Sequence, residues 1–194
     1  MTPPPIRHRG VLLLVGALAL TGCTSLSGTG EKGFVSGDGQ LTVRTASERE
    51  PAIELAGEGL AGESLDVADY RGKPVVVVVW GSWCGPCVAE APEVVEAAET
   101  LGDEAQFLGI NLRDSSTDAA QAFVRNFDVP YPSIYAPDGK AMLAFDGVLA
   151  PNSIPSFVVL DGDGRVAATI LGELPSVQTL VDVTRDVAEE TADG

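Results

Sequence analysis

The feature that most constrains the fold is the run PVVVVVW at 74–80, because two cysteines follow it closely, at positions 84 and 87. A continuous run of β-branched residues is typical of a strand that is covered on both faces of a sheet. The next segment, 85–102, carries Pro86 where a helix can begin and Gly102 where a helix can end. The sequence therefore predicts a buried strand followed by a helix, with Cys84 at the junction.

This junction is suited to thiol chemistry. A thiol at the start of a helix lies beside backbone N–H groups that have no partner within the helix, and these groups stabilise the nucleophilic thiolate. Cys87 follows one turn inside the helix, within bonding distance of Cys84, while Gly85 permits the tight entry and Pro86 lacks only an N–H that has no intrahelical use. A disulfide across two residues closes too short a loop to stabilise a fold much. We therefore expect the pair to cycle between dithiol and disulfide.

The N-terminus predicts a segment that is removed rather than folded. The basic stretch Arg7–Arg9 precedes an apolar run at 10–20, which is too short to span a bilayer comfortably. LTGC at 20–23 then resembles a bacterial lipobox, in which cleavage precedes the cysteine and the cysteine thiol carries lipid. The alternative is an ordinary secretion signal in which Cys23 is incidental.

The domain organisation follows from that prediction. We expect a lipoprotein signal peptide at 1–22, a lipidated Cys23 with a flexible Ser-, Thr- and Gly-rich tether to residue 50, and one folded domain at 51–194. The alternating segment QLTVRT at 40–45 could add a strand. Further elements are expected as a hairpin within 52–73, strands at 105–113 and 131–135, helices at 116–128, 139–147 and 176–190, and a hairpin at 156–172.

Composition excludes several classes of function. His8 is the only histidine and lies in the segment expected to be removed, so Ser-His-Asp, Cys-His and histidine metal sites drop out. The net charge of −16 argues against nucleic acid as a partner, since such binding needs a basic surface. The remaining chemistry must use thiols, carboxylates or backbone. We expect no metal, and no cofactor besides a redox-active Cys84–Cys87 disulfide.

WCGPC at 83–87, directly after an apolar strand, resembles the active site of thioredoxin-fold proteins. Members of that fold carry a cis-proline that faces the two cysteines just before a strand, and NSIPSFVVLD at 152–161 places Pro155 there. The resemblance implies that the backbone of Ile154 pairs with a substrate segment as an added strand, with the substrate sulfur over Cys84. The alternative is an ordinary trans proline that opens a strand.

A closer resemblance is to the TlpA/ResA-type membrane-anchored thiol-disulfide oxidoreductases of the redoxin group. It is carried by the anchor signal, DYRGKPVVV at 69–77, an insertion before the proline hairpin, and CGPCVAEAP at 84–92, and it covers about 51–190. The resemblance implies a thioredoxin-like three-layer α/β fold. A central mixed sheet would have helices on both faces, an N-terminal β-hairpin extension and an insertion before the cis-proline hairpin.

The same resemblance suggests roles for individual side chains. Glu90 maps onto a glutamate near the active cysteines, where it would relay a proton for Cys87 and help shape the partner groove; the alternative is a solvated acid on a helix face. Cytosolic thioredoxin buries an aspartate where this chain has Val78, which adds weight to Glu90. Trp83 would shield the disulfide and, with Gly85 and Pro86, offer partners a flat apolar surface; the alternative for Trp83 is packing in the core, which is what we expect of Trp80.

The Gly-Pro dipeptide matches that of thioredoxin, which is reducing at about −270 mV, whereas oxidants of this fold are near −120 mV. We therefore expect a reductase of exported disulfide proteins, possible clients being apocytochromes c, on the outer face of the cell membrane. The resemblance implies electron supply from a CcdA/DsbD-type membrane protein. The alternatives are a dithiol oxidase, a non-catalytic partner-binding lipoprotein and a peroxiredoxin-like peroxidase; the last expects Pro-x-x-x-Thr/Ser-x-x-Cys, where this chain has Val77 and Gly81.

Overall fold

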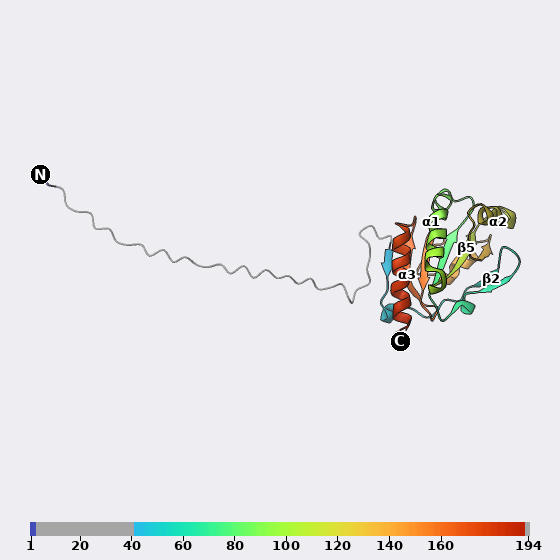
Figure 1. Cartoon of the computed structure of the whole chain (residues 1–194), viewed down its shortest axis with the longest axis horizontal. Helices are drawn as coiled ribbons and strands as arrows, with labels where there is room; N and C mark the ends of the chain where they lie inside the picture. Colours follow the sequence, from blue (N-terminus) through green and yellow to red (C-terminus); the bar gives the residue numbers. More distant parts are fainter. Residues whose placement is uncertain (3–40, 193–194) are drawn as a thin grey trace. The chain divides into compact units, whose positions relative to one another are not determined.

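The valine-rich run forms the strand at the centre of the sheet in a computed structural model, which describes residues 1–2 and 41–192 (Figure 1). All six residues of this strand, β4 (Val75–Trp80), are buried. It pairs in parallel with β5 (Gln106–Leu112) and antiparallel with β7 (Ser156–Leu160). The full order of the mixed sheet is β1-β8-β7-β4-β5-β6. The central position explains why the run is apolar throughout, since neither face of β4 meets water.

The other elements follow the expected order along the chain. The remaining strands of this sheet are β1 (Leu41–Val43), β6 (Ser133–Ala136) and β8 (Val166–Leu171). A separate hairpin consists of β2 (Ala56–Glu58) and β3 (Ser64–Asp66). The α-helices are α1 (Gly85–Leu101), α2 (Thr117–Asn126) and α3 (Val177–Ala192). Short 3-10 helices are η1 (Ala46–Glu48), η2 (Val67–Tyr70), η3 (Gly102–Glu104) and η4 (Lys140–Phe145).

The two faces of the sheet are covered by different structures. Alternate residues of β4 join one buried cluster with all three α-helices, to which Val94, Phe123 and Leu180 contribute. In Figure 1, α1 and α3 lie side by side over this face. On the opposite face, the other β4 valines pack with the 3-10 helix η4 and with the N-terminal hairpin segment. The expected three-layer fold is confirmed, and the second face carries a 3-10 helix where the sequence suggested an ordinary short helix.

The N-terminal hairpin lies within the expected range 52–73, and its first strand begins at Ala56. It docks on the edge of the sheet, because Gly59 forms an isolated antiparallel bridge with Ile134 of β6. Gly57 lies so close to β6 that an added Cβ would be 2.6 Å from Cγ2 of Ile134. The hairpin therefore protects one edge of the sheet through a contact that requires a small residue.

The folded domain begins about ten residues before the expected boundary at Pro51. Strand β1 pairs with β8, with Leu41 opposite Ile170, so the possible strand at 40–45 is confirmed in part. The side chain of Arg49 is only 2 % exposed, and its guanidinium contacts Asp161 at 3.1 Å. Residues 41–50 are thus part of the domain and not of a tether. Their polar composition suggested a tether, but the charge of Arg49 can be buried because Asp161 forms an ion pair with it.

The expectations for the signal peptide, for lipidation of Cys23 and for the tether at 24–40 lie outside the described residues, apart from Met1 and Thr2. Within the part of the chain that the structure does describe, no helix is both long enough and apolar enough to cross a membrane.

Arg49→Ala is expected to lower the free energy of unfolding by about 3 kcal/mol, because it leaves the buried carboxylate of Asp161 without its buried partner. Arg165 still contacts Asp161, at 2.9 Å, which limits the loss. The matched control is Lys140→Ala, whose ion pair with Asp138 is exposed to solvent and should contribute little to stability. Urea unfolding at neutral pH measures both, and equal losses would show that Arg49 does not hold the N-terminal segment in place.

Candidate active site

The two cysteines lie at the junction between the end of β4 and the start of α1. Cys84 is the N-cap residue of α1, and Cys87 lies in its first turn. They form a disulfide with an S–S distance of 2.07 Å. The backbone N–H of Cys87 donates to Sγ of Cys84 at 3.2 Å. The sulfur of Cys84 therefore contacts a helix N-terminal N–H, as the sequence predicts, and this contact favours the thiolate in the reduced protein.

Both sulfurs are almost inaccessible to solvent in the disulfide form. Cys84 is 5 % exposed and Cys87 is 2 % exposed, so both are buried and Cys84 only slightly less so. Their neighbours Gly85 and Pro86 are exposed, and Trp83 is 52 % exposed. The indole Nε1 of Trp83 donates to the carbonyl oxygen of Leu112 at 2.9 Å, which fixes the ring although most of it faces solvent. A partner must therefore approach over an apolar surface to reach Cys84.

Pro155 lies beside this junction. The Ile154–Pro155 peptide bond is cis, which confirms the expected geometry. Strand β7 begins at the next residue, and Ser156 is opposite Val79 near the end of β4, so the sheet brings the proline to the edge that carries the cysteines. Among the described residues, neither the N–H nor the C=O of Ile154 has a hydrogen-bond partner. Both groups are available to an extended segment of another chain.

Glu90 is buried, and the interpretation as a solvated helix-face acid is wrong. It lies three residues after Cys87 on α1, hence on the same side of the helix, and is 8 % exposed. Its Oε2 accepts a hydrogen bond from the backbone N–H of Leu174 at 2.9 Å. Burial raises the pKa of Glu90 to about 7; the Leu174 bond opposes the shift, and the charges of Glu173 and Glu93 add to it. A carboxyl with this pKa can both accept and donate a proton near neutral pH.

No second buried acid stands at the position where thioredoxin has its buried aspartate. That position is Val78 in this chain, which is apolar and 3 % exposed.

Trp80 packs in the core as expected: its ring stacks on Phe123 at 4.4 Å, and its Nε1 donates to Oγ of Ser133 at 3.1 Å. Gly109 makes room for that pair, because an added Cβ would be 2.0 Å from the Ser133 hydroxyl oxygen. These contacts therefore hold Trp80, the last residue of β4, in the core.

Sequence reasoning missed one buried acid at this edge. Asp114 follows β5, is 4 % exposed, and accepts a hydrogen bond from the backbone N–H of Ser82 at 2.9 Å. The available signal was an acid directly after the strand that is parallel to β4, since parallel strands end at the same edge of a sheet. Asp114 thus joins the segment that leads into Cys84.

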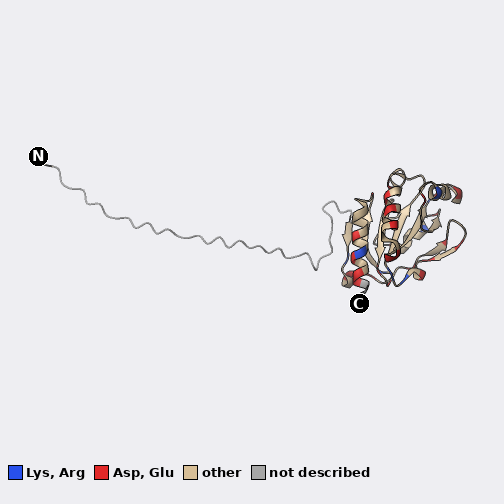
Figure 2. Cartoon of the chain, in the orientation of Figure 1, with Lys and Arg blue, Asp and Glu red and all other residues tan. Residues whose placement is uncertain are grey.

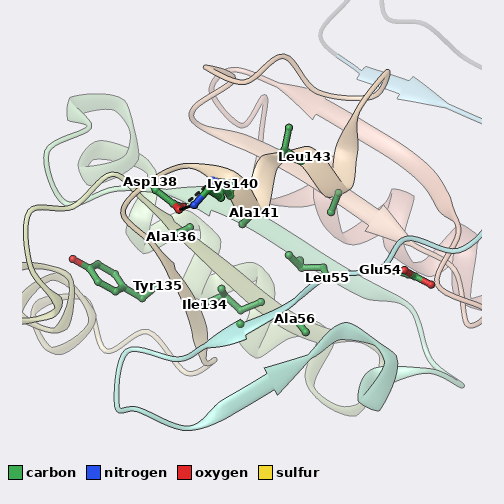
Figure 3. A pocket seen from close by; sticks show the side chains of 12 residues that line it. Glu54, Leu55, Ala56, Ile134, Tyr135, Ala136, Asp138, Lys140, Ala141 and Leu143 are labelled. Atoms are coloured by element: carbon green, nitrogen blue, oxygen red, sulfur yellow. Dashed lines mark hydrogen bonds and ion pairs between the residues drawn. The ribbon is translucent and has the colours of Figure 1, made fainter.

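Other features of the surface do not compete with the cysteines as a site. Residues 41–192 contain no cluster of three or more His, Cys, Asp or Glu side chains that could hold a metal ion. A cavity of about 480 Å³ lies between the N-terminal hairpin, β6 and η4, lined by residues such as Leu55, Ile134 and Leu143 (Figure 3). The ion pair between Asp138 and Lys140 is at this cavity, and neither cysteine lines it.

Comparisons with known proteins agree with this geometry. The family model described as Redoxin matches residues 45–184. The thiol:disulfide interchange protein HelX of Rhodobacter capsulatus is 34% identical over 130 residues, which are 66% of this chain and 69% of HelX. The thiol-disulfide oxidoreductase ResA of Bacillus thuringiensis subsp. konkukian is 27% identical over 145 residues, 74% of this chain and 82% of ResA.

Two solved structures are similar over most of their length. A DsbF homologue from Corynebacterium diphtheriae has a TM-score of 0.72 and 37% identity, covering 80% of this chain and 98% of its own. A secreted thiol-disulfide isomerase from Corynebacterium glutamicum has a TM-score of 0.73 and 32% identity, covering 80% and 96%. Both structures have the same fold as this chain.

Proposed function

Because the chain belongs to the Redoxin family and is a thiol-disulfide oxidoreductase, we propose that it works outside the cytoplasm as a reductase of disulfides in exported proteins. The observation that carries this proposal is the Cys84–Cys87 pair at the N-terminus of α1, one turn before the buried carboxyl of Glu90. The Gly-Pro dipeptide between the cysteines, which thioredoxin shares, favours the reducing direction.

In the first step, the thiolate of Cys84 attacks one sulfur of a partner disulfide. A bond forms between Sγ of Cys84 and that sulfur, the partner S–S bond breaks, and the other partner sulfur leaves as a thiolate. The N–H of Cys87, which donates to Sγ of Cys84 in the disulfide form, supports the negative charge on Cys84 before attack.

In the second step, the thiol of Cys87 transfers its proton to the carboxylate of Glu90, and the resulting thiolate attacks Sγ of Cys84. The Cys84–Cys87 disulfide forms, and the second partner sulfur leaves and takes up a proton. Both partner sulfurs end as thiols, because one takes the proton that Cys84 released to water when it ionised and the other takes the proton that Glu90 received from Cys87. The partner has then gained two electrons and two protons, and the enzyme has lost them. Burial of Glu90 and its pKa of about 7 support this role, because the group then exchanges protons readily at neutral pH.

The partner would bind across the exposed residues around the disulfide. Trp83, Gly85 and Pro86 offer apolar surface, and the unpaired backbone groups of Ile154 support pairing with an extended client segment beside Pro155. Such a surface suits the flexible cysteine-bearing segments of incompletely folded exported proteins, apocytochromes c among them. Nucleic acid is not among the proposed partners, because the chain is strongly acidic and Asp and Glu residues recur along α1 and α3 (Figure 2).

We place the enzyme at the outer face of the cell membrane, held by a lipid on Cys23 after removal of 1–22. The relative from Corynebacterium glutamicum is a secreted protein, which supports an extracytoplasmic location. In the sheet, Leu41 pairs with Ile170, next to the Ser156–Leu171 pair that follows Pro155. The first residue of β1 therefore lies at the same edge of the sheet as Pro155. Residues 23–40 would span at most about 60 Å, so the disulfide would work near the membrane, within reach of a CcdA/DsbD-type electron donor.

The peroxidase alternative has no support at this site. The position that would need a hydroxyl is Gly81, and the hydroxyl of Ser82 is bonded to Asp114. The proposed enzyme needs no cofactor besides its own disulfide.

The reduction potential of the Cys84–Cys87 couple tests the proposed direction. We expect about −250 mV or below in glutathione or dithiothreitol buffers, with reduction of insulin by the dithiol form. A value near −120 mV would instead indicate a dithiol oxidase. A disulfide that neither opens nor closes under mild reductant would leave only the non-catalytic lipoprotein.

A further inference from the structure

We propose that Asp114 is a positioning residue for Cys84 and that its buried negative charge holds the cysteine couple at a reducing potential. The proposal deepens the reductase function given above and rests on it. The first observation is where Asp114 lies. Strands β4 and β5 are parallel, with Trp80 opposite Asn111, so the residues that follow both strands meet at one edge of the sheet. Asp114 comes from one strand, and Cys84 comes from the other.

The second observation is the set of contacts that Asp114 makes. Its Oδ2 accepts from the backbone N–H of Ser82 at 2.9 Å and from Nδ2 of Asn111 at 2.5 Å, and its Oδ1 accepts from the hydroxyl of Ser82. Trp83 adds a parallel link through Nε1 to the carbonyl of Leu112 at 2.9 Å. The segment that delivers Cys84 to the start of α1 is therefore fastened to the end of β5.

The same segment has little freedom to move elsewhere. Gly81 approaches β5 so closely that an added Cβ would be 2.8 Å from Nε1 of Trp83 and 3.0 Å from the carbonyl oxygen of Leu112. Because a larger residue would force these groups apart, the close packing and the Asp114 contacts specify one path for the chain into Cys84. The position of Asp114 is thus tied to the position of the nucleophile.

The third observation concerns charge. In the described part of the chain, no Lys or Arg forms an ion pair with Asp114, so N–H and O–H dipoles alone compensate it. Ser82 is two residues from Cys84, which puts the carboxylate on the order of 10 Å from the sulfur. A like charge at such a distance in a buried setting disfavours the thiolate.

The charge acts on the redox equilibrium through the reduced form. Thiolate formation stabilises the reduced state, and couples whose reduced state is stabilised are oxidants. The N-terminus of α1 favours the Cys84 thiolate, and Asp114 opposes it from the end of β5, as does the charged form of Glu90 from α1. Asp114 therefore keeps the dithiol a good electron donor.

Asp114→Asn tests this directly, because the side chain keeps its shape and loses its charge. We expect the reduction potential to become less negative by about 30 mV, a tenfold change in the equilibrium with a reference dithiol. We also expect several-fold faster alkylation of Cys84 in the reduced protein at pH 6. Asp103→Asn is the matched control: it removes one exposed acid just beyond the far end of α1 and should change neither value.

Ser82→Ala separates the charge from simple loosening of the segment. It keeps the carboxylate and removes one donor that compensates it, so alkylation of Cys84 should become two- to threefold slower and the potential slightly more negative. Loosening alone would shift both variants in the same direction, and that outcome, or an unchanged potential in Asp114→Asn, overturns the proposal. If Asp114→Asn fails to fold, the direction in which Ser82→Ala changes the alkylation rate and the reduction potential decides whether the proposal stands. The reduction potential of the wild-type couple tests the reductase function independently of these variants.

Discussion

Cys87→Ser is expected to accumulate a covalent complex between Cys84 and a client protein. The first attack needs only Cys84 at the start of α1, whereas release needs the second sulfur, which is bonded to Sγ of Cys84 in the structure. Turnover of insulin reduction should fall on the order of a thousandfold, the scale of losing a group on which the reaction depends. Non-reducing electrophoresis, with alkylation to stop exchange, measures the complex.

Cys84→Ser is the control for that trap. The remaining thiol, Cys87, is 2 % exposed, so this variant should form no complex and reduce no insulin. A complex that forms equally well through either cysteine would contradict the assignment of Cys84 as the attacking residue. Equal, slow reduction by the wild type and by Cys84→Ser would contradict the enzyme itself and favour the non-catalytic lipoprotein.

The core of the fold could be predicted because its signals are local. The β-branched run of β4 and the proline and glycine that bound α1 specify a strand, a helix and the junction between them without distant contacts. The start of the domain depends on distant contacts instead. Strand β1 exists because β8 offers it an edge, and Arg49 is buried because Asp161, 112 residues away, accepts it.

The residues of the site also fall into those with a local sequence signal and those that depend on distant contacts. The motif around Cys84 and Cys87 and the proline at 155 could be found from sequence, because each has a fixed local pattern. The burial of Glu90 could not, since the segment after β8 covers it through Leu174. Asp114 was missed for a related reason: its link to Ser82 follows from the register of two parallel strands, which a single sequence does not reveal.

Glu90→Gln should increase stability at alkaline pH and reduce activity at the same time. The pKa of Glu90 is raised from 4.5 to about 7, so between these values the folded state binds more protons than the unfolded state. Its contribution is therefore fully present below about pH 4.5 and is lost as the pH rises through 7. Glutamine carries no charge and can still accept from the N–H of Leu174, so the variant avoids this loss.

At pH 8 we expect the oxidised Glu90→Gln protein to be more stable than the wild type by up to about 3 kcal/mol, and at pH 4.5 the two should be equal. The second step of the cycle should slow tenfold or more, because no carboxylate then takes the proton of Cys87. Denaturant unfolding across pH measures the first effect, and single-turnover release of the client measures the second. Glu96→Gln, which removes an exposed acid further along α1, should show neither effect. A stability difference that does not change with pH would mean that Glu90 does not titrate in the folded protein, and the proton transfer assigned to it would then have to be withdrawn.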